Sequence, residues 1–588
     1  MTQFDFRLLS FIGIKETPKA PWSKYYKKSA MKIHLKNESF YDFAKNKMEK
    51  HDYKDNIAIS YYGRKITYRE FFNKIDLYAS KFLSLGVRKY DVITIISANI
   101  PEAVISIYAL NKIGAVANIL HPLLSKNEIK SALNLYSSKY LITMDVMAKK
   151  VASIIDDTKV ENVIVISPRN SMNILMKSVY MIKTFKEKYK QHYKDNFISL
   201  HEFLELRNYN QPYDSNPKID DPALILQSGG STGTPKGIVL SNGNINASTI
   251  AAINACSELD SNDRILGIMP IFHGFGLEVS INDAFCVGAE VVLIPTFKAD
   301  KFHKLLIKHK PTVLVGVPTL FEALTTNEAM DKVSLSQVKY VISGGDSLSK
   351  DRVEKINDFL HDHGAKTNML QGYGLTEAVA AVTMDMKNLS KPGTIGIPWP
   401  GIYVGIFEPN SERKAPYGTD GEICICGPTV MLGYYDNEAE TNQELRHHKD
   451  GNIWLHTGDI GSMDKNGFIT YKQRLKRMII SSGYNVYPSQ IEEVLKKHEA
   501  VLNVTVVGVP HPYKVEVPKA YIVLKKGYRN SEKLREELNV LCKENLAHYS
   551  IPREYEFIDS LPKTLVGKID FRKLQEKERR KVKKNGKR

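Results

Sequence analysis

Cysteine is scarce in this sequence. Its 588 residues contain five cysteines, which are too few and too scattered for a disulfide framework. Cys424 and Cys426 lie two positions apart in an apolar run, which places both on one face of a strand. No second pair accompanies them to complete a zinc site. We therefore expect buried free thiols in a reducing compartment, at Cys256, Cys286, Cys424, Cys426 and Cys542.

Long hydrophobic runs are also lacking. No stretch approaches the roughly 18 uninterrupted apolar residues that a membrane-spanning helix needs. Residues 4–14 are apolar in patches, but they carry Asp5 and Arg7 and lack a small-residue cleavage site, so we expect no secretory signal. These absences favour a cytoplasmic protein, with at most a peripheral contact at the inner face of the membrane.

Acidic residues are outnumbered by basic ones, which gives a formal net charge of +17. Such a chain could bind nucleic acid, anionic lipid or polyanionic cofactors. The alternative that we favour is that lysines are spread over solvated faces. Because no nucleic-acid-binding motif appears, we expect no nucleic-acid partner. The apolar content of 43% and the charged content of 25% are those of an ordinary globular protein.

Short apolar runs alternate with helical patterns such as residues 68–85. This alternation predicts an α/β fold with βαβ units and largely parallel sheets. The strand-like runs are residues 92–96, 163–166, 291–294 and 313–315. After Arg474 the order changes to helix, two strands and helix, over residues 489–497, 501–509, 519–524 and 531–546. We therefore predict an N-terminal domain of residues 1–475 and a C-terminal domain of residues 476–588 with a basic tail.

A run of eleven residues, from Gln227 to Gly237, is rich in glycine, serine and threonine. Such a backbone can approach a phosphate chain closely and direct N–H groups toward it. It follows an apolar run at residues 223–226, so it would lie at the end of a strand, where α/β sheets bind ligands. The spacing around Lys236 is not that of a Walker A loop. A plain mobile loop is the alternative for this run taken alone.

Further motifs follow in a fixed order: residues 270–276 (PIFHGFG), 343–348 (SGGDSL), 371–377 (QGYGLTE), 421–423 with 433–435, 457–459 (TGD), 474–476, 482–485, and 561–564 with 567–569. Together with the glycine-rich run, they resemble the motifs of the adenylate-forming superfamily, which comprises acyl-CoA synthetases, luciferases and peptide-synthetase adenylation domains. The resemblance extends from about Tyr68 to near the C-terminus. It implies a large N-terminal domain of layered α/β subdomains with a small β-barrel-like part, and a small mobile α+β C-terminal domain.

This resemblance also implies the chemistry. A carboxylate attacks the α-phosphorus of ATP to give an acyl-adenylate and pyrophosphate, and a thiol then displaces AMP. No side-chain nucleophile is needed, because positioning and charge stabilisation carry phosphoryl chemistry. Catalytic roles fall on Lys568, Thr376 and Glu377, with His273 at the junction of acyl pocket and adenylate. Thr232 and Glu377 would hold Mg²⁺. ATP or coenzyme A would contact Ser231, Thr232, Gly233, Lys236, Gly344, Gly345, Gln371, Gly372, Tyr373, Asp459, Arg474, Lys476, Gly483 and Tyr484.

Each of these roles has a plainer structural alternative. Asp459 could form an Asx turn, and Thr376 could cap the first turn of a helix, where an anion site and a cap can coincide. His273 could be a core histidine, although the motif favours a wall of the acyl pocket. A lone lysine such as Lys568 is usually only solvated, but the motif residues 562–564 before it favour a functional role.

The substrate class is less determined than the reaction. The motifs at residues 427–434 and 479–488 are most similar to those of bacterial medium- to long-chain fatty-acid–CoA ligases. Three hypotheses stay open: a fatty-acid–CoA ligase, a ligase that loads a carrier protein or uses a non-fatty acid, and an inactive nucleotide- or membrane-binding homologue. Residues 172–194 form a loose apolar stripe among lysines, which either lies on anionic membrane or packs on the protein itself. Chain length and oligomeric state do not follow from the sequence.

Overall fold

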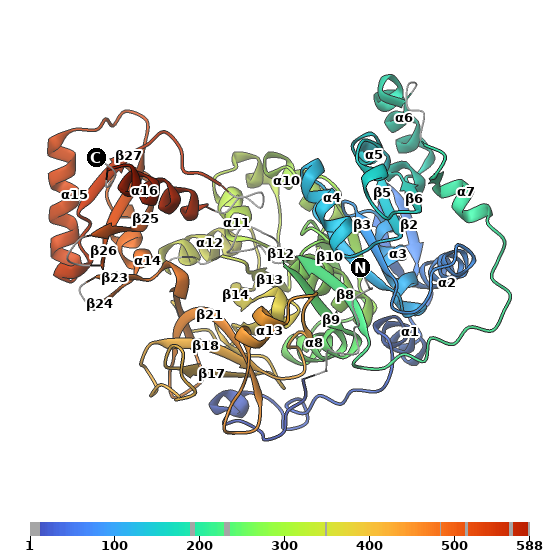
Figure 1. The fold of residues 1–588 in the computed structure, drawn as a ribbon, viewed down its shortest axis with the longest axis horizontal. Coiled ribbons are helices and arrows are strands. Elements are labelled where there is room, and N and C mark those ends of the chain that lie inside the picture. The colour runs from blue at the N-terminus through green and yellow to red at the C-terminus, as the bar shows by residue number, and fades with distance from the viewer. Residues whose placement is uncertain are drawn as a thin grey trace. The chain divides into compact units, whose positions relative to one another are not determined.

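The computed structural model describes residues 12–188, 194–227, 236–346, 348, 350–481, 484–511, 515–563 and 569–585. The chain divides into two compact units. Unit 1 comprises Met1–Gly405, Cys424–His456 and Asp464–Ile469, and unit 2 comprises Ile406–Ile423, Thr457–Met463 and Thr470–Arg588. Unit 1 alternates strands and helices, as the sequence pattern predicts (Figure 1).

An eight-stranded sheet in unit 1 has the strand order β19-β9-β8-β4-β3-β5-β6-β7. Its central strands pair in parallel, and β3 and β4 are buried along their whole length, as expected of strands covered on both faces. The strands are β3 Val92–Ile96, β4 Val116–Leu120, β5 Tyr140–Met144, β6 Asn162–Ile166, β7 Phe197–Ser199, β8 Pro222–Gln227, β9 Gly237–Ser241 and β19 Gly433–Tyr434.

A nine-stranded sheet in unit 1 has the order β16-β15-β14-β13-β12-β10-β11-β1-β2. Strands β10 to β14 pair in parallel, whereas β15 returns antiparallel beside β14. The strands are β1 Ile57–Tyr61, β2 Arg64–Thr67, β10 Arg264–Gly267, β11 Glu290–Leu293, β12 Val313–Gly316, β13 Tyr340–Ser343, β14 Met369–Gly374, β15 Ala381–Met384 and β16 Ile397–Pro398.

The helices of unit 1 begin at recognisable sequence signals. Thr67 and Glu70 form a capping box at α2, Ser125 and Glu128 form one at α4, and Pro101 opens α3. The helices are α1 Phe40–His51, α2 Tyr68–Ser84, α3 Pro101–Lys112, α4 Lys126–Leu135, α5 Asp145–Ala152, α6 Ile174–Lys188, α7 Leu200–Glu205, α8 Asn242–Ala255, the π-helix η5 Phe275–Asn282, α9 Asp283–Val287, α10 Phe302–His309, α11 Pro318–Thr325, α12 Lys350–Asp362 and α13 Glu438–Glu444.

Each of these two sheets packs against helices through an apolar core. One core joins strands β10 to β14 to helices α10, α11 and α12, which are labelled in Figure 1. Its centre is fully buried at Phe321 and Val341. The other lies between the eight-stranded sheet and helices α4 and α5, around Ile129, Leu133 and Leu141. Because the apolar helix faces cover the sheets, the carboxyl ends of the parallel strands are left for ligands.

Unit 2 contains the helix, strand and helix order that the sequence predicts after Arg474. The four elements lie within a few residues of their expected bounds, at α14 Pro488–Lys496, β25 Val501–His511, β26 Val515–Leu524 and α15 Glu532–Asn545. A sheet with the order β24-β23-β26-β25, with β27 beside β26, packs on these helices around Ile491, Ala520 and Leu538. The other elements are β23 Ile479–Ser481, β24 Tyr484–Val486, β27 Glu554–Phe557 and α16 Phe571–Asn585.

The chain passes between the two units within strands β17 Tyr403–Phe407, β18 Gly421–Cys426, β21 Ile453–Met463 and β22 Ile469–Arg474. The short strand β20 Leu445–His447 pairs with β21. All five cysteines are free and buried, which confirms the expectation from their scarcity. No helix among the described residues is long and apolar enough to cross a bilayer.

Candidate active site

The glycines at the carboxyl end of β13 form a close-packed floor in unit 1. Gly344 and Gly345 directly follow this strand, and Gly345 has a φ of +85°, which favours glycine. The Gly344 N–H donates to the Gly316 carbonyl at 3.1 Å. A Cβ on Gly344 would lie 3.2 Å from the ring of Phe275. The structure therefore brings these two glycines, which are predicted to contact ATP or coenzyme A, against the motif predicted to line the acyl pocket.

Gln371, Gly372 and Tyr373 lie within the last residues of β14, next to β13. Asp385, which belongs to none of the sequence motifs, forms two hydrogen bonds with the backbone of Gln371. The Gln371 N–H donates to Asp385 Oδ2 at 3.1 Å, and the Asp385 N–H donates to the Gln371 carbonyl at 2.9 Å. Burial raises the pKa of the Asp385 carboxyl to about 7. The sequence gives little sign of this role for Asp385, because the residue is a single polar position directly after the apolar strand β15.

Thr376 and Glu377 lie in the short 3-10 helix η8, Thr376–Ala378. The cap position is occupied by Leu375 without a side-chain cap, so the interpretation of Thr376 as the cap of a helix is wrong. The reason is that the chain turns back at once into β15, which leaves no room for an α-helix. The Glu377 carbonyl accepts a hydrogen bond from the Met431 N–H at 2.8 Å, which holds η8 to the segment before β19.

The Glu377 carboxylate is linked to Lys236 through a tyrosine. Tyr434 in β19 donates its hydroxyl to Glu377 Oε1 at 3.1 Å. The Lys236 ammonium lies over the Tyr434 ring, 4.8 Å from its centroid, and forms an ion pair with Glu440. Burial and the nearby Glu377 charge raise the pKa of the Tyr434 hydroxyl, so it stays a donor. Sequence reasoning missed the roles of Tyr434 and Glu440, although Tyr434 belongs to a motif that it noted.

His273 precedes the π-helix η5 and is half-buried, which argues against a fully buried core histidine. Its carbonyl accepts hydrogen bonds from the N–H groups of Gly276 and Leu277 at 3.0 and 2.9 Å. The neighbouring Phe272 ring packs on His121, with centroids 4.2 Å apart. A π-helix is rare and frequently lies at a functional site, which agrees with a specialised role for this segment.

In unit 2, Asp459 lies inside the eleven-residue strand β21 and is 1% exposed. A simple Asx turn is therefore wrong for this position, because strand pairing fixes its backbone. The Arg474 guanidinium contacts Asp459 Oδ1 at 3.0 Å and donates to the Thr457 carbonyl at 3.2 Å. The structure thus brings together two residues that the resemblance implies as contacts of ATP or coenzyme A.

Several predicted site residues lie outside the described part of the chain: Ser231, Thr232, Gly233, Gly483 and Lys568. The described neighbours fix where those segments attach. Strand β8 ends at Gln227, so the glycine-rich run follows the end of a strand as predicted, and the next strand, β9, begins at Gly237. A bridge between Lys563 and Ile569 closes the segment that contains Lys568.

Two predicted site residues, Lys476 and Tyr484, lie at or after the predicted domain boundary, and the structure describes their backbone. Lys476 lies in the 3-10 helix Leu475–Arg477, and Tyr484 opens β24. The adjacent Arg477 forms an ion pair with Glu492 and lies 4.9 Å from the ring centroid of Phe571. Arg477 therefore connects the 3-10 helix to α14 and α16, all within unit 2.

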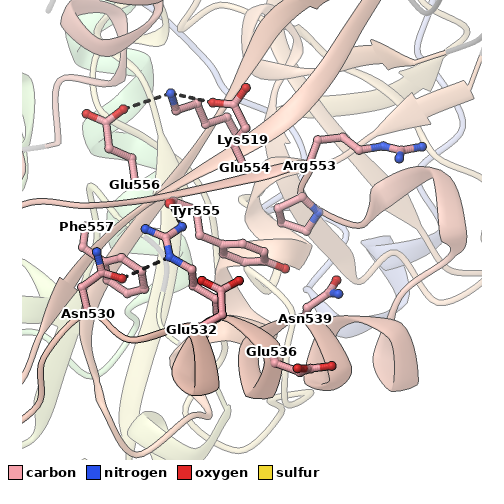
Figure 2. Close-up of a pocket in the computed structure, with 12 residues that line it drawn as sticks. Lys519, Asn530, Glu532, Glu536, Asn539, Arg553, Glu554, Tyr555, Glu556 and Phe557 are labelled. Carbon is pink, nitrogen blue, oxygen red and sulfur yellow. Dashed lines mark hydrogen bonds and ion pairs between the residues drawn. The ribbon is translucent and has the colours of Figure 1, made fainter.

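An open hollow of about 770 Å³ on unit 2 contains none of the predicted site residues (Figure 2). Lys519 forms ion pairs with Glu554 and Glu556 at 2.9 Å each, and Arg535 donates a hydrogen bond to the amide oxygen of Asn530 at 3.1 Å. Lys519 is only 5% exposed, which indicates a structural role in joining β26 to β27. The hollow is thus no candidate for the adenylation chemistry.

Comparisons with known proteins agree with this geometry. The family model described as AMP-binding enzyme matches residues 47–435, and the model of the AMP-binding enzyme C-terminal domain matches residues 490–568. A long-chain-fatty-acid–CoA ligase of Bacillus subtilis is 35% identical over 535 residues, which cover 89% of this chain and 92% of that protein. A protein of the same name from Yersinia pestis is 30% identical, with coverage of 90% and 92%.

Among solved structures, ATP-bound MatB from Rhodopseudomonas palustris superimposes with a TM-score of 0.79 at 24% identity, covering 92% of this chain and 99% of that one. This likeness confirms the α/β fold predicted from the alternating pattern. The first family model alone matches well over half of the chain, and its range contains the glycine-rich run, Gly344, Gln371 and Glu377. The chain therefore belongs to the AMP-binding enzyme family.

Proposed function

We propose that this protein activates a fatty acid with ATP and transfers the acyl group to coenzyme A, which yields acyl-CoA, AMP and pyrophosphate. The observation that carries the proposal is the 35% identity to a long-chain-fatty-acid–CoA ligase over nearly the full length of both chains. ATP and coenzyme A are then the co-substrates of an AMP-forming acid–thiol ligase. The relatives named as fatty-acid–CoA ligases favour an aliphatic acid over an amino acid.

We assign the residues of unit 1 to ATP and its metal. Tyr434 donates to Glu377 Oε1 and so orients this carboxylate, and a carboxylate is the kind of oxygen ligand that Mg²⁺ binds. Bound Mg²⁺ would neutralise charge on the phosphates, with Thr232 as the other protein ligand. Lys236 supplies a cation beside the strand that follows the glycine-rich run, and Thr376 donates to the α-phosphate. Gly344, Gly345, Gln371, Gly372 and Tyr373 surround adenine.

The residues of unit 2 complete the assignment. Asp459 accepts the ribose hydroxyls, with Arg474 holding its carboxylate. Lys568 stabilises the charge that develops on the α-phosphate and carboxylate during adenylation. A domain boundary near Lys476 lets the C-terminal domain move between the half-reactions, and Gly483 and Tyr484 then face coenzyme A.

A panel of carboxylic acids tests the proposal. Pyrophosphate release is measured for saturated fatty acids, aryl acids and amino acids, and AMP release is measured with and without coenzyme A. We expect the highest kcat/KM for a fatty acid and coenzyme A-dependent AMP release. An aryl or amino acid as the best substrate, or AMP release that depends on a carrier protein alone, would contradict it. No release with any acid would indicate an inactive homologue.

We also propose that α6 contacts the inner face of the membrane, from which a fatty acid would be taken. Ile174, Leu175 and Ile182 are 87%, 72% and 76% exposed, while Met172 just before the helix is buried. Exposed apolar residues on a lysine-bearing helix suit an anionic surface. Sedimentation with anionic vesicles compares wild type with a Leu175→Glu, Ile182→Glu variant. Equal partitioning of the two folded proteins would refute the contact.

A further inference from the structure

The backbone at Val379, directly after η8, has an unusual conformation. Its φ of 69° and ψ of −66°, with the Ala380 N–H donating to the Ala378 carbonyl at 2.9 Å, define a γ-turn of the rare and strained kind. Among the described residues with a positive φ, Val379 alone is β-branched, and such side chains resist this conformation most. A strained turn persists only where its surroundings determine it from several sides.

Two glycines leave room for the carbonyl groups of this turn. A Cβ on Gly274, in the motif with His273, would lie 2.0 Å from the Val379 carbonyl oxygen. A Cβ on Gly374, at the end of β14, would lie 1.6 Å from the Ala380 carbonyl oxygen. Both distances are far below van der Waals contact. The turn is therefore in direct backbone contact with two of the segments that form the candidate site.

Hydrogen bonds fix the other side of the turn. The Val379 N–H donates to the Thr376 carbonyl at 3.0 Å, and the Glu377 carbonyl accepts from the Met431 N–H. After the turn the chain must pair at once, because Ala381 in β15 is opposite Gly374 in β14. Val379 itself is 2% exposed. The strain arises because the chain must reverse within three residues while η8 keeps its hydrogen bond to Met431.

We propose that Val379 is a positioning residue for adenylation. Its turn fixes Thr376 and Glu377 relative to the His273–Gly274 segment, so the groups assigned to the α-phosphate and metal cannot move independently of the acyl side. A β-branched residue suits this role because its stiff side chain leaves the backbone few other conformations once packing has fixed the γ-turn. The inference rests on the proposed function, because that function assigns the roles of Thr376 and Glu377. The strain at Val379 follows from its backbone angles alone.

Two variants separate strain from packing. Val379→Ala and Val379→Gly both remove the γ-methyl groups, and they differ in the Cβ alone. At an ordinary position glycine is less stable than alanine, but at a positive φ the order reverses. We expect the glycine variant to melt at a higher temperature than the alanine variant. A glycine variant that melts at or below the alanine variant would show that the turn is unstrained and would overturn the proposal.

Catalysis should change in the opposite direction. Glycine lets the turn sample more conformations, so the reacting groups are aligned for a smaller fraction of the time. We expect kcat for pyrophosphate release to be about tenfold lower in the glycine variant than in the alanine variant, with the KM for the acid within about twofold. The part of ATP affinity that depends on Mg²⁺ should fall in the same order, measured by titration calorimetry with and without the metal.

Equal kcat and equal Mg²⁺-dependent affinity in the two variants would show that the strain has no positioning role. If the wild type released no pyrophosphate with any acid of the panel, the proposed function would fail. The melting order and the Mg²⁺-dependent ATP affinity would still decide the role of Val379 in that case, so the two failures are distinguishable.

Discussion

Replacing Tyr434 by phenylalanine removes a single hydroxyl from the link between Glu377 and Lys236. The ring stays, so the contact with the Lys236 ammonium at 4.8 Å is retained. The lost interaction is the hydrogen bond of 3.1 Å to Glu377 Oε1. Because Tyr434 is 4% exposed, no bulk water can take the place of its hydroxyl without rearrangement. The variant therefore tests whether the orientation of one carboxylate matters to ATP binding.

The expected magnitude follows from the charge and exposure of the acceptor. A hydrogen bond to a charged group contributes about 1.5–3 kcal/mol, and the lower end applies because Glu377 is half-buried. A loss of about 1.4 kcal/mol is a factor of ten in an equilibrium constant. We therefore expect the KM for Mg²⁺–ATP to rise about tenfold, with a change of less than about twofold in the KM for the fatty acid.

Tyr53→Phe is the matched control, because this buried tyrosine donates to the Phe285 carbonyl at 3.0 Å in the same unit, and that carbonyl belongs to none of the groups assigned to ATP. Both variants lose one tyrosine hydroxyl, so their melting temperatures should fall by similar amounts. Steady-state pyrophosphate release is measured for each protein over a range of Mg²⁺–ATP. In a Glu377→Gln background, Tyr434→Phe should have little further effect on KM. An unchanged KM in Tyr434→Phe, or equal changes in both tyrosine variants, would refute the reasoning.

Four other variants give further predictions. Burial raises the pKa of the folded Asp385 carboxyl to about 7, so the folded protein keeps this proton to a higher pH than the unfolded chain does, and the stability falls between about pH 4 and 7. Asp385→Asn should therefore raise the melting temperature at pH 8 and leave it unchanged at pH 4. Equal shifts of the melting temperature at both pH values would contradict this. Lys568→Ala should lower adenylation by about 10²-fold, yet still convert supplied acyl-adenylate and coenzyme A to thioester. Lys476→Pro should show the opposite pattern, because a locked φ hinders domain movement; equal loss of both half-reactions in these two folded variants would refute alternation about Lys476. Gly374→Ala should unfold the β14–β15 return or lower the melting temperature strongly, because its Cβ would overlap the Ala380 carbonyl.

The local chemistry of the chain could be read from the sequence, because it depends on neighbours along the chain. The alternation of apolar strands with helices gave the α/β fold, and strand and helix bounds such as Val92–Ile96 and Tyr68–Ser84 lie close to the expected ones. Ordered motifs gave the family and pointed to segments such as Gly344–Gly345 and Gln371–Tyr373. These motifs consist of glycines and polar residues at fixed spacing, so no long-range contact is needed to recognise them.

Contacts between segments far apart in the sequence were decided by the tertiary structure alone. Tyr434 meets Glu377 across 57 positions because strand β19 joins β9 at the edge of the eight-stranded sheet. Asp385 reaches Gln371 because β15 returns beside β14. The short helix at Thr376 and the strained turn at Val379 arise from that same return, which strand pairing imposes against local preference. A sequence motif specifies which groups are available, but only the pairing of strands and the packing around them determines which groups meet.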